Sequence, residues 1–170
     1  PRVVEALKAI PTLSIVLAPD GLMGATNGIY THSLSRGLAW ERPASAELIV
    51  PGEDDEGFQV DCGLRMQGGS SARPGEGKHA FRLLFKSEYG ASKLRHRLFP
   101  DSPVDEFDTI VLRCFSTDSW HFKDGGARYR RWDSQFIRDL WMKDSQLAMG
   151  HVSGHNVYVH LYVNGLYWGI

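Results

Sequence analysis

Four small residues followed by a lysine form the part of the sequence best suited to bind phosphate. The stretch Gly68-Gly69-Ser70-Ser71 carries little side-chain bulk, so its backbone N–H groups could approach phosphate oxygens closely. Lys78 follows this stretch and opens a strand-like run, where its ammonium group could pair with the same oxygens. Arg65 and Arg73 flank the stretch and are further candidates for contact with phosphate. The chemistry indicated is the binding of a phosphorylated ligand.

The same pattern also has an ordinary structural interpretation. The stretch is neither a Walker A motif nor the G-x-G-x-x-G loop of protein kinases. Loops of glycine and serine also connect strands in many β proteins, and most lysines are exposed to solvent without any ligand. The spacing alone therefore leaves two interpretations of Lys78 open, a phosphate contact or an exposed lysine at the edge of a sheet.

A strand lysine that binds nucleotide phosphates commonly pairs with an acid on a neighbouring helix. Asp139 and Asp144 are the acidic residues well inside the longest predicted helix. They are five positions apart, which places them about 140° apart around the helix axis. Only one of them could point at Lys78, and each also fits a solvated helix face. The pattern does not choose between them, and the acid could instead lie after Ile170.

Other motifs with recognisable chemistry are few. His151 and His155 are four positions apart, but Ser153 and Gly154 between them disfavour the helix that would bring both imidazoles to one face. No metal site is therefore predicted. The sequence contains no Gly-x-Ser-x-Gly, His-Glu-x-x-His or Cys-x-x-Cys motif.

Alternation of apolar and polar residues predicts the strands that would position these groups. In the clearest run, 58–68, every second residue is apolar, while Arg65 and other polar residues lie between them. A second alternating run, 79–86, follows the glycine-serine stretch, so the two runs are predicted to form an antiparallel hairpin. Asn164-Gly165 predicts a further hairpin turn. The remaining predicted strands are 13–18, 40–50, 107–115 and 157–163.

The longest helix is predicted near 132–148, where apolar residues recur at helical spacing. Asp133 or Ser134 could cap its start and Gly150 could close its end. Phe136, Leu140 and Trp141 are expected to pack on the apolar face of the sheet.

These elements predict the fold class and the domain organisation. The fold class is α+β, an antiparallel sheet of about five or six strands with one main helix. The run Ile110-Val111-Leu112 is apolar on both faces and predicts a central strand. At 170 residues the chain is expected to be a single domain, 1–170. Cys62 and Cys114 both lie in strand-like runs, where free thiols and a bridge between neighbouring strands both remain open.

The composition bears on the partners of the protein. It is 42% hydrophobic and 23% charged, as is usual for a globular protein. Lys and Arg number 19 against 20 for Asp and Glu, so the basic surface typical of a nucleic-acid-binding protein is not expected. No apolar run approaches the roughly 20 residues needed to cross a bilayer, so no membrane span is expected in this segment. The composition leaves the oligomeric state open.

Three stretches occur together in an order that points to one protein family. The first is Trp40-Glu41-Arg42-Pro43-Ala44-Ser45, preceded by Gly28-Ile29-Tyr30. The second is 63–71, followed by 78–83 and Tyr89-Gly90, and the third is 162–170. Together they resemble the CotH family, the spore coat protein H-like atypical protein kinases. The resemblance extends from about Ile10 to Ile170.

Membership of this family would imply a kinase-like fold that binds ATP with a divalent metal such as Mg²⁺ and phosphorylates Ser or Thr of partner proteins. The chain would supply the N-lobe side of that fold, as the truncated N-terminal portion of a CotH-like domain. Lys78 would be the catalytic lysine, and the nucleotide would be bound by Lys78, Arg65, Arg73 and the stretch Gly68 to Ser71. By itself this portion is expected to be inactive. The resemblance also implies a spore coat, cell-surface or secreted location.

The alternative interpretation is a non-enzymatic surface or carbohydrate-binding β module. Exposed aromatic side chains would then serve as platforms on which sugar rings stack. Candidates are Tyr158, Tyr162, Tyr167 and Trp120. Paired metal-binding carboxylates after Ile170 would favour the kinase, and their absence would favour the module.

Overall fold

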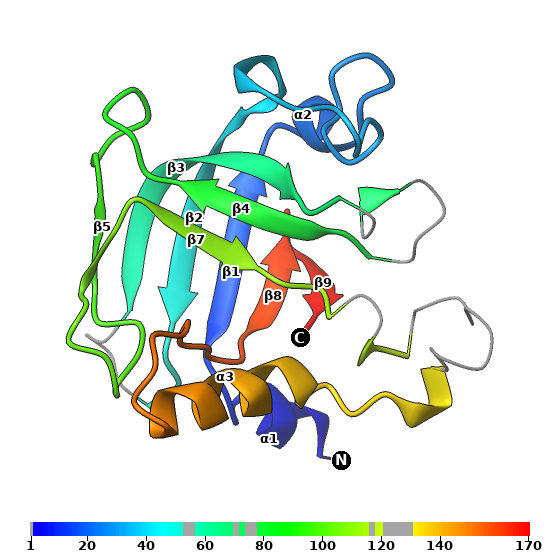
Figure 1. Ribbon diagram of the computed structural model, residues 1–170. Coiled ribbons are helices and arrows are strands. Elements are labelled where there is room, and N and C mark those ends of the chain that lie inside the picture. The colour runs from blue at the N-terminus through cyan, green and yellow to red at the C-terminus, as the bar shows by residue number, and fades with distance from the viewer. Residues whose placement is uncertain (1, 53–56, 70–71, 74–77, 116–117, 121–130) are drawn as a thin grey trace.

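A computed structural model describes residues 2–52, 57–69, 72–73, 78–115, 118–120 and 131–170. The fold is mixed α+β, with much sheet and few helices, and its body is one curled sheet of seven strands (Figure 1). The strand order is β7-β4-β3-β2-β1-β8-β9. The bounds of these strands are β1 (Thr12–Leu17), β2 (Arg42–Ile49), β3 (Phe58–Gln67), β4 (Ala80–Leu84), β7 (Thr109–Leu112), β8 (His160–Val163) and β9 (Leu166–Gly169).

The remaining elements are short, apart from one helix. A two-stranded sheet is formed by β5 (Leu94–Arg95) and β6 (Glu106–Phe107). Helices α1 (Val3–Leu7) and α2 (Pro19–Met23) have five residues each, and α3 (Arg138–Ala148) has eleven. Two 3₁₀ turns, η1 (Leu38–Trp40) and η4 (Arg131–Asp133), complete the described elements. The sequence predicted neither α1 and α2 nor the small sheet, because each is shorter than a periodic pattern can reveal.

The hairpins predicted from sequence are confirmed. Strands β3 and β4 pair antiparallel, with Leu64 opposite Leu83 and Arg65 opposite Arg82. Strands β8 and β9 also pair antiparallel, and they join through a turn in which Asn164 and Gly165 have φ of 51° and 77°. Two successive positive φ angles are the signature of the type I′ turn that Asn-Gly favours.

The prediction of an all-antiparallel sheet of five or six strands is wrong in two respects. The sheet has seven strands, and β1 pairs in parallel with β8, with Thr12 opposite His160 and Ile15 opposite Val163. Alternation along a strand reports which face is buried and not the direction of its neighbour. The prediction that Ile110-Val111-Leu112 is a central strand is also wrong, because β7 lies at one edge of the sheet. Val111 is exposed, and Ile110 and Leu112 are only half-buried.

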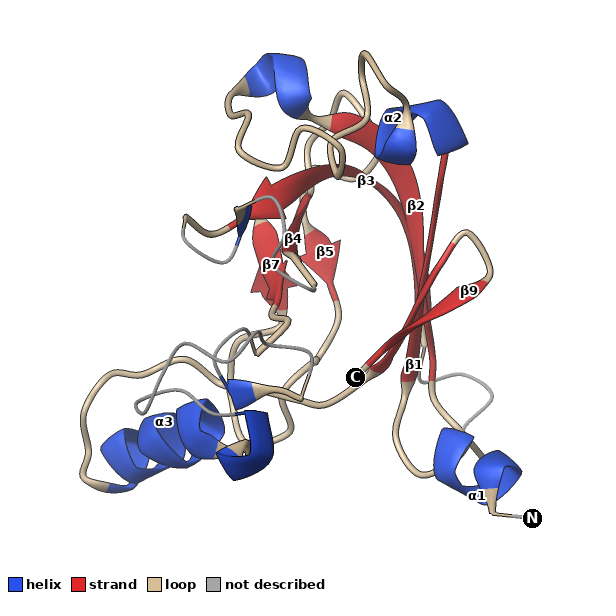
Figure 2. Ribbon diagram, turned by 90° about the vertical axis from the view of Figure 1, so that its right-hand side faces the viewer, coloured by secondary structure: helices blue, strands red, loops and turns tan. Residues whose placement is uncertain are grey.

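The core lies on one face of the sheet, here called the inner face. Residues that alternate along the strands point there, and Ile15, Ala46, Leu64, Phe81 and Leu83 are almost inaccessible to solvent. The residues between them, including Arg65 and Arg82, point to the opposite, outer face. The curl of the sheet visible in Figure 2 brings the inner faces of β4 and β1 toward each other.

The main helix is less closely packed than the sequence predicted. None of its residues is buried, and Figure 2 shows α3 to one side of the curled sheet. Leu140 faces the sheet, but Trp141 is 64% exposed, so the prediction that Trp141 packs on the sheet is wrong. The helix carries apolar residues on two sides, with Leu140 and Leu147 on one and Ile137 and Trp141 on the other. Periodicity cannot decide between two such stripes.

The cap predicted for this helix is also different. Ile137 occupies the N-cap position and makes no side-chain hydrogen bond there, so neither Asp133 nor Ser134 caps the helix. Asp118 supplies the acceptors from a distant loop instead. Its carboxylate accepts hydrogen bonds from the backbone N–H groups of Gln135 and Arg138, at 2.9 and 3.4 Å. Gly150 has a φ of 79° just after the helix, as a closing glycine does.

Cys62 and Cys114 are not joined by a disulfide. Burial of Cys62 in the core raises its pKa to about 12, so it is unreactive near neutral pH. Within the described residues, none of the helices is both long and apolar enough to span a membrane.

Candidate functional site

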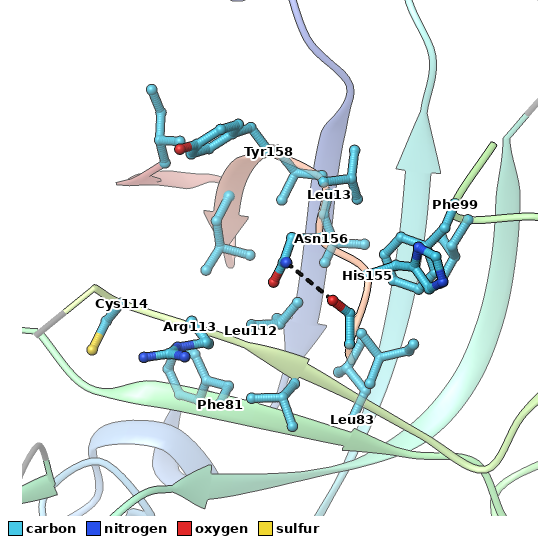
Figure 3. A pocket seen from close by; sticks show the side chains of 18 of the residues that line it. Leu13, Phe81, Leu83, Phe99, Leu112, Arg113, Cys114, His155, Asn156 and Tyr158 are labelled. Atoms are coloured by element: carbon cyan, nitrogen blue, oxygen red, sulfur yellow. Dashed lines mark hydrogen bonds between the residues drawn. The ribbon is translucent and has the colours of Figure 1, made fainter. Parts of the chain in front are cut away.

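A cavity of about 440 Å³ lies between the inner face of the sheet and α3. Figure 3 shows side chains from β1, β4, β7 and the 154–159 segment converging on it. Its lining is mostly apolar, which is usual for sites that bind small molecules, and its size falls in the range of such sites. The apolar side chains labelled in Figure 3 are Leu13, Phe81, Leu83, Phe99 and Leu112.

Three of the charged residues on this lining form a network. Arg113, just after β7, forms an ion pair with Asp139 of α3 at 2.6 Å. Lys143, one turn further along α3, reaches the same Asp139 oxygen at 2.9 Å and Oδ1 of Asn156 at 3.0 Å. Burial alone would raise the pKa of Asp139, but the hydrogen bond from Lys143 and the charge of Arg113 lower it by more. This network ties α3 to the edge of the sheet.

Lys78 lies on the same lining, at the entrance to β4. Its ammonium group donates a hydrogen bond to the backbone carbonyl of Trp168 in β9. Burial of the amine lowers the pKa of Lys78. Gly169 follows with a φ of 113°, and a Cβ there would fall almost on Nζ of Lys78. Lys78 therefore connects the start of β4 with the end of β9 across the curl of the sheet.

The helix acid expected to pair with Lys78 does not do so. Asp139 lines the same cavity as Lys78, but its carboxylate is held by Arg113 and Lys143. Asp144 is exposed. Among the described residues, the hydrogen-bond partner of Lys78 is a carbonyl oxygen and not a carboxylate.

The glycine-serine loop is described only at its ends. Gly68 has a φ of 100°, and its carbonyl accepts a hydrogen bond of 2.6 Å from Arg36. Ser70 and Ser71 lie outside the described residues. Ala72 is fully buried and its carbonyl accepts a bond of 2.6 Å from Ser33, while Arg73 is exposed. Gly68 and Gly69 are not part of the cavity lining, so the described residues do not bring them together with Lys78.

Arg65 lies on the outer face of the sheet and contacts a buried acid, Glu41. The Glu41 side chain is 1% exposed. Its Oε1 accepts hydrogen bonds from Lys86 at 2.6 Å and from Tyr89 at 2.7 Å, and its Oε2 pairs with Arg65. Burial alone would raise the pKa of Glu41, but these hydrogen bonds and the charge of Arg65 lower it by more. Gly63 leaves room for this cluster, because a Cβ there would lie 2.7 Å from Oε1.

Sequence reasoning assigned Glu41 no role, although it lies in one of the stretches that carry the family resemblance. Its neighbours Lys86 and Tyr89 are separated from it by more than forty positions, so no local pattern could reveal the cluster. The hint available was a charged residue directly before an alternating strand, which is too common to be informative.

The described residues contain no group of three His, Cys, Asp or Glu side chains arranged to hold a metal ion. His155 stacks on Phe99 with ring centroids 5.9 Å apart, and His151 is exposed. Trp120, one of the candidate platforms for sugar rings, is exposed.

The chain matches no protein-family model, no curated protein and no solved structure.

Proposed function

We propose that the chain is the N-terminal portion of a CotH-like protein kinase, in which Lys78 contacts the phosphates of ATP. The observation that carries this proposal is the position of the Lys78 ammonium group. It is partly buried at the edge of a cavity of ligand size and faces a carbonyl oxygen instead of an acid. A titratable group with a lowered pKa in an apolar cleft is a common property of functional sites.

The family resemblance assigns the sequence neighbours of Lys78 to the same role. In the proposed site, backbone N–H groups of the loop from Gly68 to Ser71 would lie along the phosphates and Arg73 would approach from the same loop. Arg73 is exposed and thus accessible to a ligand. Arg65 points to the outer face, where Glu41 holds it. We therefore leave Arg65 out of the proposed contacts with ATP, although the family resemblance suggested it.

Phosphoryl transfer also needs Mg²⁺ ions on the phosphates and an Asp that orients the nucleophile. The described residues offer no group that would hold such an ion, so the proposal places the metal-binding carboxylates in the remainder of a longer protein. The N-terminal portion would supply the lysine, the loop and the sheet that positions them. Its substrates would be Ser or Thr residues of partner proteins, as the resemblance implies.

Binding of ATP by the full-length protein, with and without Mg²⁺, tests the proposal. Lys78→Met keeps the apolar stem and removes the charge, and Lys93→Met is the matched control because Lys93 pairs with Glu106 on the small sheet. We expect Lys78→Met to lower transfer of labelled phosphate to a Ser-rich acceptor at least tenfold, equivalent to about 1.4 kcal/mol. Lys93→Met should leave transfer unchanged. Equal labelling by the wild type and Lys78→Met would exclude Lys78 from the mechanism.

The carbohydrate-binding alternative receives less support from the geometry. Tyr158 donates its hydroxyl to the carbonyl of Phe136 and stacks on Phe115, so it is engaged within the protein. Tyr162 and Tyr167 meet edge-on, with their rings 61° apart, and do not form a flat platform. If the full-length protein neither binds ATP nor transfers phosphate, binding to immobilised polysaccharides is the experiment to perform next.

A further inference from the structure

Two arginines lie directly opposite each other on the outer face of the sheet. Arg65 of β3 and Arg82 of β4 are register partners in an antiparallel pair. Side chains opposite each other in such a pair have Cβ atoms about 4.5–5.5 Å apart, and like charges at this spacing repel. An arrangement of this kind is stabilised when an anion lies between the two charges.

Each of the two guanidinium groups has a buried Nε–H without a hydrogen-bond acceptor among the described residues. Arg65 pairs through Nη2 with Glu41, yet its Nε is buried and lacks a hydrogen-bond acceptor among the described residues. The Nε of Arg82 is also buried and lacks a hydrogen-bond acceptor among the described residues. Within the described part of the chain, no ion pair to Arg82 is found either. Buried polar groups without partners are rare in proteins, and an ion or water commonly explains them.

The charge balance around the pair is also incomplete. Glu41 is the buried carboxylate in this region, and it already serves Arg65, Lys86 and the hydroxyl of Tyr89. Glu88 is largely exposed and approaches Lys86 at 3.6 Å. Asp61, also on β3, is exposed and lies beyond Gly63, at the far end of the β3–β4 pairing from Arg82. Arg82 is thus the cation of this cluster that no acid of the described chain neutralises.

We propose that Arg65 and Arg82 together bind an oxyanion, such as a phosphate group, on the outer face of β3 and β4. The planar fork of a guanidinium group matches the spacing of two phosphate oxygens, and two such forks can hold one phosphate from both sides. This site faces away from the cavity that Lys78 lines, because Arg65 and Arg82 alternate with the core residues Leu64 and Leu83. The inference does not rest on the kinase proposal.

Titration of inorganic phosphate into the full-length protein tests the site directly. The Nε–H groups of arginines give resolved signals in two-dimensional ¹H–¹⁵N NMR spectra, and we expect the signals of Arg65 and Arg82 to shift in a saturable manner. Sodium chloride at equal ionic strength should not reproduce this shift. The Nε–H signal of Arg95, which pairs with Glu106 on the small sheet, is the internal control. Equal shifts of all three signals, or no shift of Arg82, would overturn the proposal.

Variants complete the test. Arg82→Gln should abolish the rise in melting temperature caused by phosphate, Arg82→Lys should reduce it, and Arg95→Gln should preserve it. If Arg82→Gln does not fold, the comparison of Arg82→Lys with the wild type still decides, because an unchanged response to phosphate would contradict the proposal. Titrations with a phosphoserine peptide and with ATP, each without metal, show whether the site prefers free phosphate, a phosphorylated protein or a nucleotide. Lys78→Met should leave the phosphate response intact, which separates failure of this site from failure of the proposed ATP site.

Discussion

Lys78 and Trp168 are ninety positions apart, yet the ammonium group of the first donates a hydrogen bond to the backbone carbonyl of the second. The contact joins the entrance of β4 to β9, at one edge of the sheet. It also brings a partly buried positive charge to the edge of the apolar cavity. The residue that the sequence singled out for phosphate chemistry therefore has a second role, since it helps to close the curl of the sheet.

Gly169→Ala should disrupt this contact. The backbone of Gly169 has a φ of 113°, and the added Cβ would displace the Lys78 ammonium group from the Trp168 carbonyl. We expect a loss of about 1–3 kcal/mol in the free energy of unfolding, as is typical of non-glycine residues in such conformations. Urea denaturation measures it. Gly69→Ala is the control, because no atom lies within 4 Å of a Cβ there and its φ is not positive. A loss as large in the control would mean that the cost does not come from the Lys78 contact.

Glu41→Gln should destabilise the fold. The substitution keeps the shape of the side chain but leaves Arg65 and Lys86 without their carboxylate. We expect a cost of roughly 3 kcal/mol, at the low end for removing one partner of a buried ion pair, because both cations are partly exposed. Glu47→Gln is the control, since Glu47 is exposed on β2. Equal stability of Glu41→Gln and the wild type at neutral pH would show that the cluster contributes nothing to folding.

The same cluster predicts how stability depends on pH. The pKa of Glu41 in the folded protein lies below its usual value of about 4.3. The resulting stabilisation is therefore fully present above that usual value and is lost as the pH falls through the folded pKa. Melting temperatures between pH 3 and pH 7 should fall more steeply toward low pH in the wild type than in Glu41→Gln. Parallel curves for the two proteins would contradict the predicted linkage.

Core substitutions should distinguish the sheet from the helix. Phe81 is 1% exposed and packs against Tyr30 and Trp168, so Phe81→Ala should cost about 3–5 kcal/mol. Leu140 is only half-buried at the cavity wall. Leu140→Ala should therefore cost less than about 2 kcal/mol, below the usual range for core leucines. Chemical denaturation of both variants measures the difference. A larger loss for Leu140→Ala would mean that α3 is packed as tightly as the sheet.

These contrasts show what local sequence could and could not predict. Alternation in 58–68 and 79–86 determined two strands and their pairing, because the same side-chain pattern must bury one face. It did not predict the parallel pairing of β1 with β8, which joins segments at opposite ends of the chain. For the site, the sequence selected Lys78 but not its partner. Trp168 contributes a backbone carbonyl, and every residue type has one.

The charge clusters could not be predicted from local sequence either, because their members are far apart along the chain. Glu41 meets Lys86 and Tyr89 only after β2, β3 and β4 have paired, so its burial is a property of the sheet and not of the residues beside it. Asp139 was one of two helix acids proposed as partners for Lys78, but its carboxylate pairs with Arg113 and Lys143 instead. The sequence showed that Asp139 is an acid that could pair with a cation. Whether it pairs with Lys78 or with Arg113 depends on where the helix lies.

Asp139→Asn should loosen α3 without unfolding the sheet. The helix buries none of its residues. The ion pair of Asp139 with Arg113 links it to the residue just after β7, and Lys143, which also pairs with Asp139 within the helix, links it to Asn156. The asparagine oxygen can still accept hydrogen bonds but the side chain carries no charge, and we expect a loss of about 1 kcal/mol, typical of partly exposed ion pairs. Hydrogen exchange should quicken at the amides of α3 and remain unchanged in β3 and β4. Asp144→Asn alters an exposed acid of the same helix and should change neither the exchange rates in α3 nor the free energy of unfolding.

High salt should reduce the difference between the wild type and Asp139→Asn, because screening weakens the ion pairs that the substitution removes. If exchange in α3 stays the same in Asp139→Asn, apolar contacts such as that of Leu140 hold the helix instead.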